Sequence, residues 1–193
     1  MLAADLVLLE QGMENFTIDQ VVAKANIAKG TVYKYYKSRD DLLLELSVKA
    51  LNIMLEMFEE AVSRGTTSSE KVKNVCKASY QFYNEYNQYF ILVTHIDRPE
   101  FKVDIYDYMK VSHKVQNMFQ SIIEEGQRNG EFSSRYDPKY IQFIVWASSV
   151  GVVQFIDSKK ALIENVNDVD IDEFINTYAE LIASGLIKNS TEK

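Results

Sequence analysis

The sequence predicts an all-α protein, and three observations support this fold class. Only seven glycines and two prolines occur in 193 residues, whereas a β-sandwich or barrel needs turn residues every eight to twelve positions, roughly. Apolar residues make up 47% of the chain, enough to form a buried core. Several stretches repeat apolar residues at helical spacing and start with residues that cap helices.

A first helix is expected over residues 2–10, ended by Gly12, and a second helix is expected to start after Thr17. Thr17 and Gln20 have the spacing of a capping box, and Phe16 and Val21 have that of a hydrophobic staple. An apolar stripe at helical spacing follows. The sequence therefore predicts a short capped helix here.

The link from this helix to the next is very short. Asn26 tolerates positive φ and is expected to end the second helix, and a third helix starts at about Ala28. Two short helices joined by a turn of three or four residues form a helix-turn-helix. Val32 is expected to face the second helix, whereas Lys29, Tyr33 and Lys34 project outward.

Charge is distributed unevenly along the chain. The formal net charge of −7 argues, by itself, against a nucleic-acid binder, because such affinity depends on neutralising phosphates. Residues 20–39, however, contain no Asp or Glu and five cations, namely Lys24, Lys29, Lys34, Lys37 and Arg39. Because the second helix of a helix-turn-helix lies in the DNA major groove, this run favours DNA binding. A solvated helix face is the alternative.

Gly30 lies in the first turn of the expected third helix. There it costs about 1 kcal/mol of helix stability relative to Ala. A bare backbone at this point would permit close approach to a base or a phosphate. The alternative is that Gly30 marks a loose helix start.

A dense motif runs from the second helix into a long helix that a second capping box, Ser38 with Asp41, is expected to open. It comprises Thr17, Val21, Ala25, Asn26, Ile27, Lys29, Gly30, Thr31, Val32, Tyr33, Tyr35, Tyr36, Lys37, Ser38, Arg39 and Leu42. This motif resembles the DNA-binding signature of the TetR family of bacterial repressors, and the resemblance covers about residues 3–46. The segment 124–132, followed by Asp137 and Pro138, resembles a weaker feature of the family's C-terminal domain.

The resemblance implies a helix-turn-helix DNA-binding domain over residues 1–46 and a helical ligand-sensing and dimerisation domain over residues 47–193. It implies a cytoplasmic, ligand-responsive transcriptional regulator and not an enzyme, with repression as the family's usual mode. The expected partners are a palindromic double-stranded DNA operator, a small-molecule effector and a second copy of the chain. No membrane, cofactor or metal is expected.

The resemblance also implies roles at the DNA. Lys29, Gly30 and Lys34 would approach base edges, and Lys34 is the leading candidate for sequence discrimination. Lysine can donate to O6 and N7 of guanine, whereas phosphate contacts fix the register. Phosphate contacts are implied for Thr17, Tyr33, Tyr35 and Lys37 or Arg39, and Thr31 completes the candidate set.

Three features depart from the family's pattern. Asn26 stands where a Gly is usual, and Ala28 stands where a Ser usually caps the recognition helix, a cap worth about 1 kcal/mol. The sequence begins almost within its first helix, whereas family members often carry a basic arm upstream. The net charge, the missing basic arm and the uncapped Ala28 support a rival reading, a helical ligand carrier or interaction module that does not bind DNA.

Further helices are expected over residues 39–64, 70–90, 103–128, 138–157 and 171–187, with an irregular stretch at 91–102 around Pro99. Asp137 is an expected N-cap with proline at the first helical position, and Asp170 with Glu173 forms another capping box. The resemblance implies that the last two long helices build a four-helix dimer interface. Its candidates are Ile144, Ala147, Gly151, Phe174, Tyr178 and Leu181, although core packing would explain the same stripes.

Aromatic residues are dense in the C-terminal part, which suits an apolar ligand pocket with a few polar groups. The ligand candidates are Tyr83, Tyr86, Met109, His113 and Trp146, and core packing is again the alternative. The single cysteine, Cys76, excludes an internal disulfide and is expected to be buried. His95, with Asp97 and Glu100, lacks a fixed ligand spacing. No phosphate loop, zinc-ligand pair or nucleophile motif indicates an enzyme.

Overall fold

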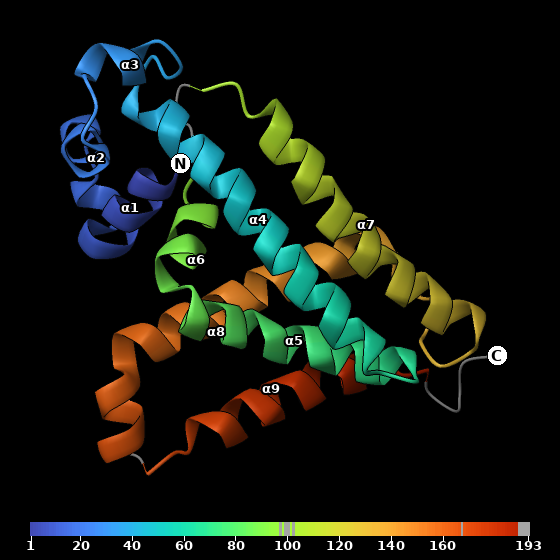
Figure 1. Cartoon of the computed structure of the whole chain (residues 1–193). Coiled ribbons are helices and arrows are strands. Elements are labelled where there is room, and N and C mark those ends of the chain that lie inside the picture. Colours follow the sequence, from blue (N-terminus) through green and yellow to red (C-terminus); the bar gives the residue numbers. More distant parts are fainter. Residues whose placement is uncertain (97, 99–100, 102, 167, 189–193) are drawn as a thin grey trace. The chain divides into compact units, whose positions relative to one another are not determined.

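The computed structural model describes residues 1–96, 98, 101, 103–166 and 168–188 (Figure 1). Within these residues the backbone forms nine α-helices and no β-strand, so the predicted all-α class is confirmed. The helices are α1 (Leu2–Asn15), α2 (Ile18–Ala25), α3 (Lys29–Tyr33), α4 (Arg39–Ser63), α5 (Ser68–Glu85), α6 (Asn87–Val93), α7 (Tyr106–Arg128), α8 (Pro138–Asn165) and α9 (Ile171–Leu186).

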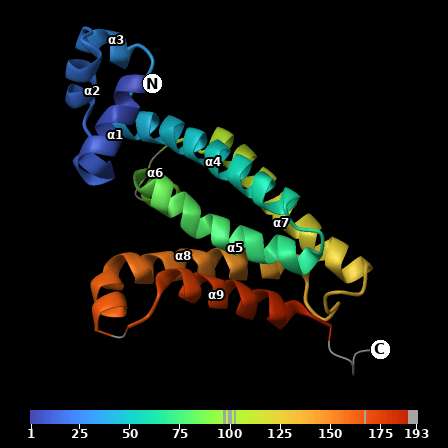
Figure 2. The ribbon, with the colours of Figure 1, turned by 60° about the horizontal axis from the view of Figure 1, so that its bottom comes forward.

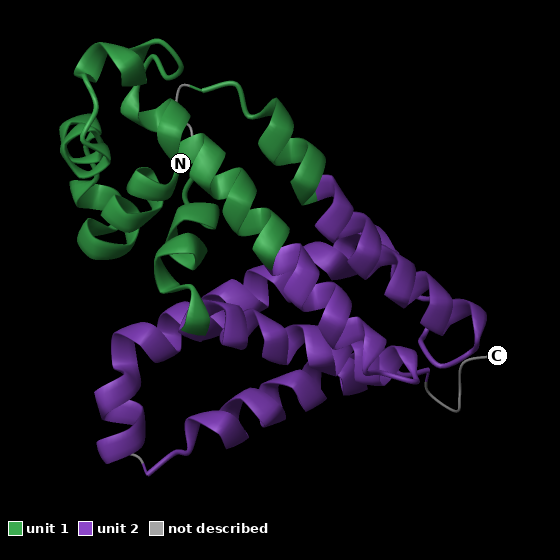
Figure 3. Ribbon diagram, viewed as in Figure 1, with its two compact units in different colours: residues 1–53, 85–112 green, residues 54–84, 113–193 purple. Residues whose placement is uncertain are grey.

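The chain divides into two compact units (Figure 3). Unit 1 comprises residues 1–53 and 85–112, and unit 2 comprises residues 54–84 and 113–193. Helices α4 and α7 each contribute residues to both units. Unit 1 therefore contains the whole predicted DNA-binding domain together with α6 and the first turns of α7. The functional boundary at residue 46 stays a prediction.

Unit 1 begins with α1, which breaks at Gly12. Gly12 has a φ of +72°, a backbone conformation that residues with a Cβ rarely adopt. The chain resumes helical turns and α1 ends at Asn15, beyond the expected stop. Thr17 then caps α2, because its Oγ1 accepts a hydrogen bond from the backbone N–H of Gln20 at 3.3 Å. The Gln20 Oε1 in turn accepts from the Thr17 N–H at 2.8 Å, which confirms the capping box.

The start of α4 is tied to the turn before α2. Ser38 and Asp41 exchange two bonds of a second capping box, from the Ser38 N–H to the Asp41 carboxylate at 2.9 Å and from the Asp41 N–H to the Ser38 hydroxyl at 3.1 Å. The Arg39 guanidinium donates from Nε to the carbonyl of Phe16 at 2.8 Å and from Nη2 to the carbonyl of Met13. Arg39 thereby joins α4 to the chain reversal that leads into α2.

A buried charge joins α1, α4 and α6 within unit 1. Asp5 is only 7% exposed, and its carboxylate accepts from the Tyr89 hydroxyl at 2.6 Å and from the Lys49 ammonium at 2.6 Å. The same ammonium lies 5.6 Å from the centre of the Tyr89 ring. Burial, and then the bond to Asp5, raise the pKa of Tyr89, which keeps its hydroxyl a donor. A buried carboxylate is stable only with such partners, so the three helices are held in one arrangement.

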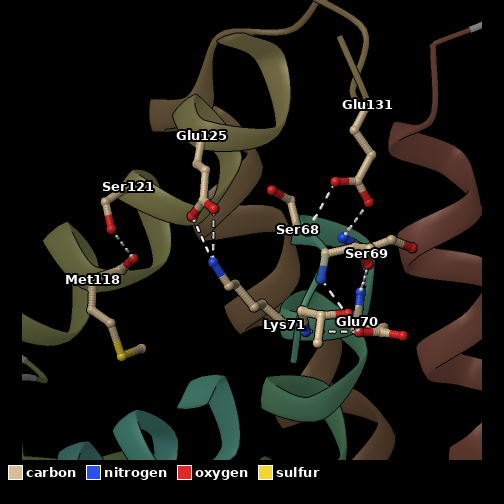
Figure 4. Close-up of polar contacts among 10 residues, drawn as sticks. Ser68, Ser69, Glu70, Lys71, Met118, Ser121, Glu125 and Glu131 are labelled. Carbon is tan, nitrogen blue, oxygen red and sulfur yellow. Dashed lines mark hydrogen bonds and ion pairs between the residues drawn. The ribbon is translucent and has the colours of Figure 1, made fainter. Parts of the chain in front are cut away.

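In unit 2, the turn after α7 holds the start of α5 (Figure 4). The Glu131 carboxylate accepts from the backbone N–H groups of Ser68 at 2.9 Å and Ser69 at 2.7 Å, which satisfies unpaired donors of the first helical turn. The Lys71 ammonium donates hydrogen bonds to both oxygens of the Glu125 carboxylate, at 2.7 and 2.8 Å. These contacts give a physical reason for the acidic residues of the segment 124–132.

The glycines of that segment also have specific tasks. Gly130 ends the turn with a φ of +75°, as expected for a left-handed position after a helix. Gly126 lies against the ring of Phe132, which is 1% exposed, and a Cβ at Gly126 would come within 2.3 Å of the ring. Only glycine leaves room for the Phe132 side chain to fold back onto α7.

Helices α5, α8 and α9 lie side by side in unit 2 (Figure 2). Ile156 and Ile163 of α8 form a buried cluster with Ile171 and Ile175 of α9. Asp137 caps α8 by accepting from the Lys139 N–H at 2.8 Å, and Asp170 caps α9 by accepting from the Glu173 N–H at 2.8 Å, as predicted. Burial raises the pKa of the Cys76 thiol on α5 to about 12, in keeping with a buried apolar role.

Two predicted helix boundaries are wrong for identifiable reasons. The expected helix 70–90 breaks at Tyr86, whose φ of −134° and ψ of 49° are not helical, and this break lets Tyr89 reach Asp5. The expected end of α8 at residue 157 is too early, because burial of Ile163 against α9 extends the helix to Asn165. Tertiary contacts outweighed the local sequence pattern in both places.

Helix α7 begins at Tyr106, three residues later than expected. Pro99, and with it Asp97 and Glu100, lies outside the described residues. Among the helices that are described, α8 is the one that is long and apolar enough to cross a membrane, with a mean hydropathy of 1.3 over its most apolar window, of which 33% is buried. Core helices of soluble proteins pass the same test.

We expect Gly126→Ala to lower the free energy of unfolding by about 1–3 kcal/mol, because the added methyl group collides with the Phe132 ring. Gly185→Ala on α9 is the matched control, since its Cβ would meet no atom within 4 Å, and it should be neutral or stabilising by up to about 1 kcal/mol. Urea unfolding followed by circular dichroism measures both. Equal effects of the two variants would contradict the role given to Gly126.

Candidate DNA-binding site

The turn between α2 and α3 is built on Asn26. Asn26 has φ 52° and ψ 48°, the predicted left-handed conformation, and its N–H closes the end of α2 by donating to the carbonyl of Ala23 at 3.2 Å. The Ile27 N–H bonds back to the carbonyl of Val22 at 3.4 Å, and α3 begins two residues later, at Lys29. This is the tight helix-turn-helix connection that the sequence predicts.

The faces of α3 are sorted as expected. Val32 is 5% exposed and lies in the core of unit 1, where Ile18 and Val21 of α2 are buried too. Tyr33 is 46% exposed and Tyr35 is 71% exposed. The predicted DNA-facing residues that lie exposed are Thr17, Lys29, Gly30, Thr31, Tyr33, Lys34, Tyr35 and Lys37.

Helix α3 itself is shorter than expected. It ends at Tyr33, and the chain continues as a turn in which the Tyr35 and Tyr36 N–H groups both bond the carbonyl of Val32 at 3.0 Å. The Ala28 side chain makes no cap bond, so the start of α3 lacks the stabilisation that a serine would give. The Tyr36 hydroxyl donates to the Glu45 carboxylate at 2.5 Å, and this contact holds the end of the turn on α4.

Lys29 of α3 and Lys34 of the following turn each lie over a tyrosine ring. The Lys29 ammonium is 5.9 Å from the centre of the Tyr33 ring, and the Lys34 ammonium is 5.9 Å from that of the Tyr35 ring. Such cation–π contacts are weakly attractive, so they restrict the flexible lysine side chains. The two hydroxyls and two ammonium groups form a surface of hydrogen-bond donors.

One acidic residue lies beside this surface, although the sequence segment 20–39 contains none. Asp19, one position before that segment, forms an ion pair with Lys29, with 2.6 Å between Oδ1 and Nζ. The hydrogen bond to Asp19 raises the pKa of Lys29. Sequence analysis missed this pair because Asp19 belongs to the first turn of α2, and only folding brings it to the start of α3.

Arg39 does not share the exposure of the other candidates. Its guanidinium is engaged with the Phe16 and Met13 carbonyls and with the Asp40 carboxylate at 3.2 Å. In this arrangement Arg39 positions the helix-turn-helix, so Lys37 is the better candidate for the backbone clamp. Thr17 uses its hydroxyl within the capping box, where it also donates to the Gln20 Oε1 at 2.9 Å.

Comparison with known proteins agrees with this geometry. A model of bacterial regulatory proteins of the tetR family matches residues 1–46. The fatty acid metabolism regulator protein of Bacillus subtilis is 22% identical over 186 residues, which cover 95% of this chain and 92% of that protein. Residues 1–46 therefore belong to the DNA-binding domain of the TetR family. The HTH-type transcriptional repressor KstR2 of Mycolicibacterium smegmatis is 21% identical over 146 residues, covering 72% and 70% of the two chains.

Solved structures show the same fold. The transcriptional regulator FadR from Bacillus subtilis, solved in complex with stearoyl-CoA, matches with a TM-score of 0.72 and 21% identity. The match covers 95% of this chain and 96% of that one. The named relatives are transcriptional regulators rather than enzymes. Among the described residues, no group of three His, Cys, Asp or Glu side chains could hold a metal.

The predicted effector residues fall in both units. Tyr86 and Met109 belong to unit 1, and Tyr83, His113 and Trp146 belong to unit 2. The Tyr83 hydroxyl donates to the Asp157 carboxylate, whereas His113 is exposed. Their assembly into one pocket therefore stays a prediction.

The predicted dimer residues separate into two groups. Ile144 is 62% exposed and Leu181 is 69% exposed, and Ala147 and Gly151 are exposed as well. Phe174 packs on the isoleucine cluster of unit 2. The Tyr178 hydroxyl lies 2.9 Å from each of the Ser148 and Ser149 hydroxyls, and burial raises the pKa of Tyr178 to about 12. Phe174 and Tyr178 therefore pack within their own chain, where both are half-buried, and their part in a dimer interface stays a prediction.

The variant Gly30→Ala separates the two readings of Gly30. A Cβ at Gly30 meets no atom within 4 Å, so the free chain should become more stable, by about 0.5–1 kcal/mol. We expect weaker DNA binding at the same time, because the methyl group would stand between the backbone and the DNA. Thermal unfolding and fluorescence anisotropy with labelled duplex measure the two effects. Unchanged DNA affinity would show that Gly30 marks only a loose helix start.

Proposed function

We propose that this protein is a cytoplasmic transcriptional regulator that binds an operator through α3 and is released from it by a small molecule. The observation that carries the proposal is the exposed lysine and tyrosine surface of α3 on a capped helix-turn-helix. Lys29, Gly30 and Lys34 would approach base edges, because the N-terminal part of the second helix enters the major groove. Thr31, Tyr33, Tyr35 and Lys37 would contact phosphates and the groove wall.

The rival reading, a ligand carrier that does not bind DNA, rests on the net charge of −7. Selection of duplexes from a random pool decides between the two readings. A regulator should enrich a palindromic sequence, and the logarithm of its affinity should fall with the logarithm of salt concentration, with a slope of about −0.9 for each phosphate neutralised. A chain that enriches no duplex, or binds without salt dependence, is a carrier or interaction module.

The proposal includes a homodimer formed through α8 and α9. The exposed apolar side chains Phe143, Ile144, Phe155 and Leu181 lie on these two helices. Exposed Ala147 and Gly151 would let a partner helix approach closely. An apolar surface of this kind favours burial against a second copy, and two recognition helices then meet two half-sites of a palindromic operator.

We expect Leu181→Asp to shift the protein from dimer to monomer, since it places a charge where apolar surface would be buried. Tyr106→Asp is the matched control, because Tyr106 is 72% exposed in unit 1, outside α8 and α9. Sedimentation velocity distinguishes the two states. The interface would lie elsewhere if both variants sedimented like the wild-type dimer.

The effector class proposed for the first test is a long-chain acyl-CoA. The support is the likeness to the FadR regulator solved with stearoyl-CoA, together with the aromatic and apolar composition of the C-terminal helices. Because α4 contributes residues to both units, a ligand that displaces one half of α4 would move the other half as well. By linkage, a ligand that weakens operator binding must itself bind more weakly to the operator complex.

Titration of stearoyl-CoA into the complex with the selected duplex tests this effector class. We expect the fluorescence anisotropy of the labelled duplex to fall as stearoyl-CoA is added, whereas free CoA leaves it unchanged. The acyl chain would then be the recognised part. An anisotropy that stays constant with both compounds rejects acyl-CoA as the effector class and leaves the DNA-binding assignment to its own test.

A further inference from the structure

The ion pair between Asp19 and Lys29 lies at the start of α3, in the surface that is proposed to contact DNA. Asp19 comes from the first turn of α2 and Lys29 is the first residue of α3. Their side chains are 70% and 54% exposed, so the pair contributes little to stability. Within the described part of the chain, Lys34 and Lys37 form no ion pair. Of the exposed lysines of α3 and the turn after it, only Lys29 is therefore paired with a carboxylate, that of Asp19.

We propose that Asp19 is a specificity-determining residue for DNA, which holds the Lys29 ammonium for base recognition and withholds it from phosphates. This inference rests on the proposed function and goes beyond it, since Asp19 is not among the residues that define the DNA-binding motif. The contact between Oδ1 and Nζ is 2.6 Å, and the Tyr33 ring lies 5.9 Å from the same ammonium. The two contacts fix the position of an otherwise flexible side chain.

The charges of Asp19 and Lys29 explain how the pair would favour specific over non-specific DNA binding. Non-specific DNA binding rests on cations that neutralise phosphates, so a lysine already paired with a carboxylate adds little to it. An ammonium group has three donors, and two remain after the bond to Asp19. Lys29 can therefore still donate to a base edge while Asp19 lowers the attraction to every phosphate nearby.

The pair also matches one base pair in particular. Lysine donates to O6 and N7 of guanine, and a carboxylate accepts from the N4 amino group of cytosine. The two remaining donors of Lys29 match the two acceptors of guanine better than the single N7 acceptor of adenine, so a lysine next to a carboxylate is complementary to the major-groove edge of a G·C pair. The geometry predicts one strongly preferred G·C pair in each half-site.

The test compares Asp19→Asn with wild type on two duplexes, the duplex that wild type selects from a random pool and a mixed-sequence duplex of equal length. We expect the variant to bind the mixed-sequence duplex more tightly and with a steeper salt slope, by about 0.9 for each lysine released. The ratio of the two affinities should fall about tenfold, within the range for the loss of one base contact. Repeated selection with the variant should lose the preference at one base pair per half-site.

Glu10→Gln is the matched control. It removes the same charge and frees Lys24 of α2 from an ion pair of 2.5 Å, but Lys24 is not on α3. It should leave the affinity ratio unchanged. In a Lys29→Gln background, Asp19→Asn should have no further effect on the ratio, because no ammonium is left to release.

A change of both affinities by the same factor, or an equal loss of discrimination in Glu10→Gln, would overturn the role of Asp19. An effect of Asp19→Asn that persists without Lys29 would overturn it too. Wild type that binds neither duplex would instead refute the proposed function itself. Because the Asp19 side chain is 70% exposed, the variant is expected to fold, and thermal unfolding verifies this.

Discussion

The position of the recognition helix depends on how the turn before α2 is fastened to the start of α4. Arg39 donates to the carbonyls of Phe16 and Met13, and Phe16 is fully buried beneath this contact. The capping boxes at Thr17 and Ser38 hold the two helix starts on either side. With both ends of the α2–α3 segment fixed, a helix of only five residues can present its side chains in one direction.

The rest of unit 1 extends this arrangement through a buried carboxylate. Asp5 binds Lys49 and Tyr89, so α6 is joined to α1 and α4 by groups that cannot be left unpaired in the interior. At the surface, too, individual charged groups are held by specific partners. The protein is acidic overall, and its cations near α3 are placed by tyrosine rings and by one carboxylate, Asp19, rather than by a uniformly basic surface.

Local sequence patterns predicted most helix starts, because a capping box needs only side chains a few residues apart. Thr17 with Gln20 and Asp137 with Pro138 both act in the structure as their residue types indicate. Helix ends were harder to predict. Tyr86 interrupts a continuous helical pattern, and Ile163 prolongs α8 past polar residues, since contacts with distant segments decided both.

The sequence by itself determined the all-α class, the helix-turn-helix and the likeness of residues 1–46 to the TetR family, because these follow from periodicity, capping and a dense local motif. Only the tertiary structure decided that Arg39 acts inside the fold, that Tyr178 and Phe174 face their own core, and that Asp19 reaches Lys29. The reason is physical. Each of these contacts joins groups from different segments of the chain, and the spacing of those groups along the sequence does not reveal which turns bring them together.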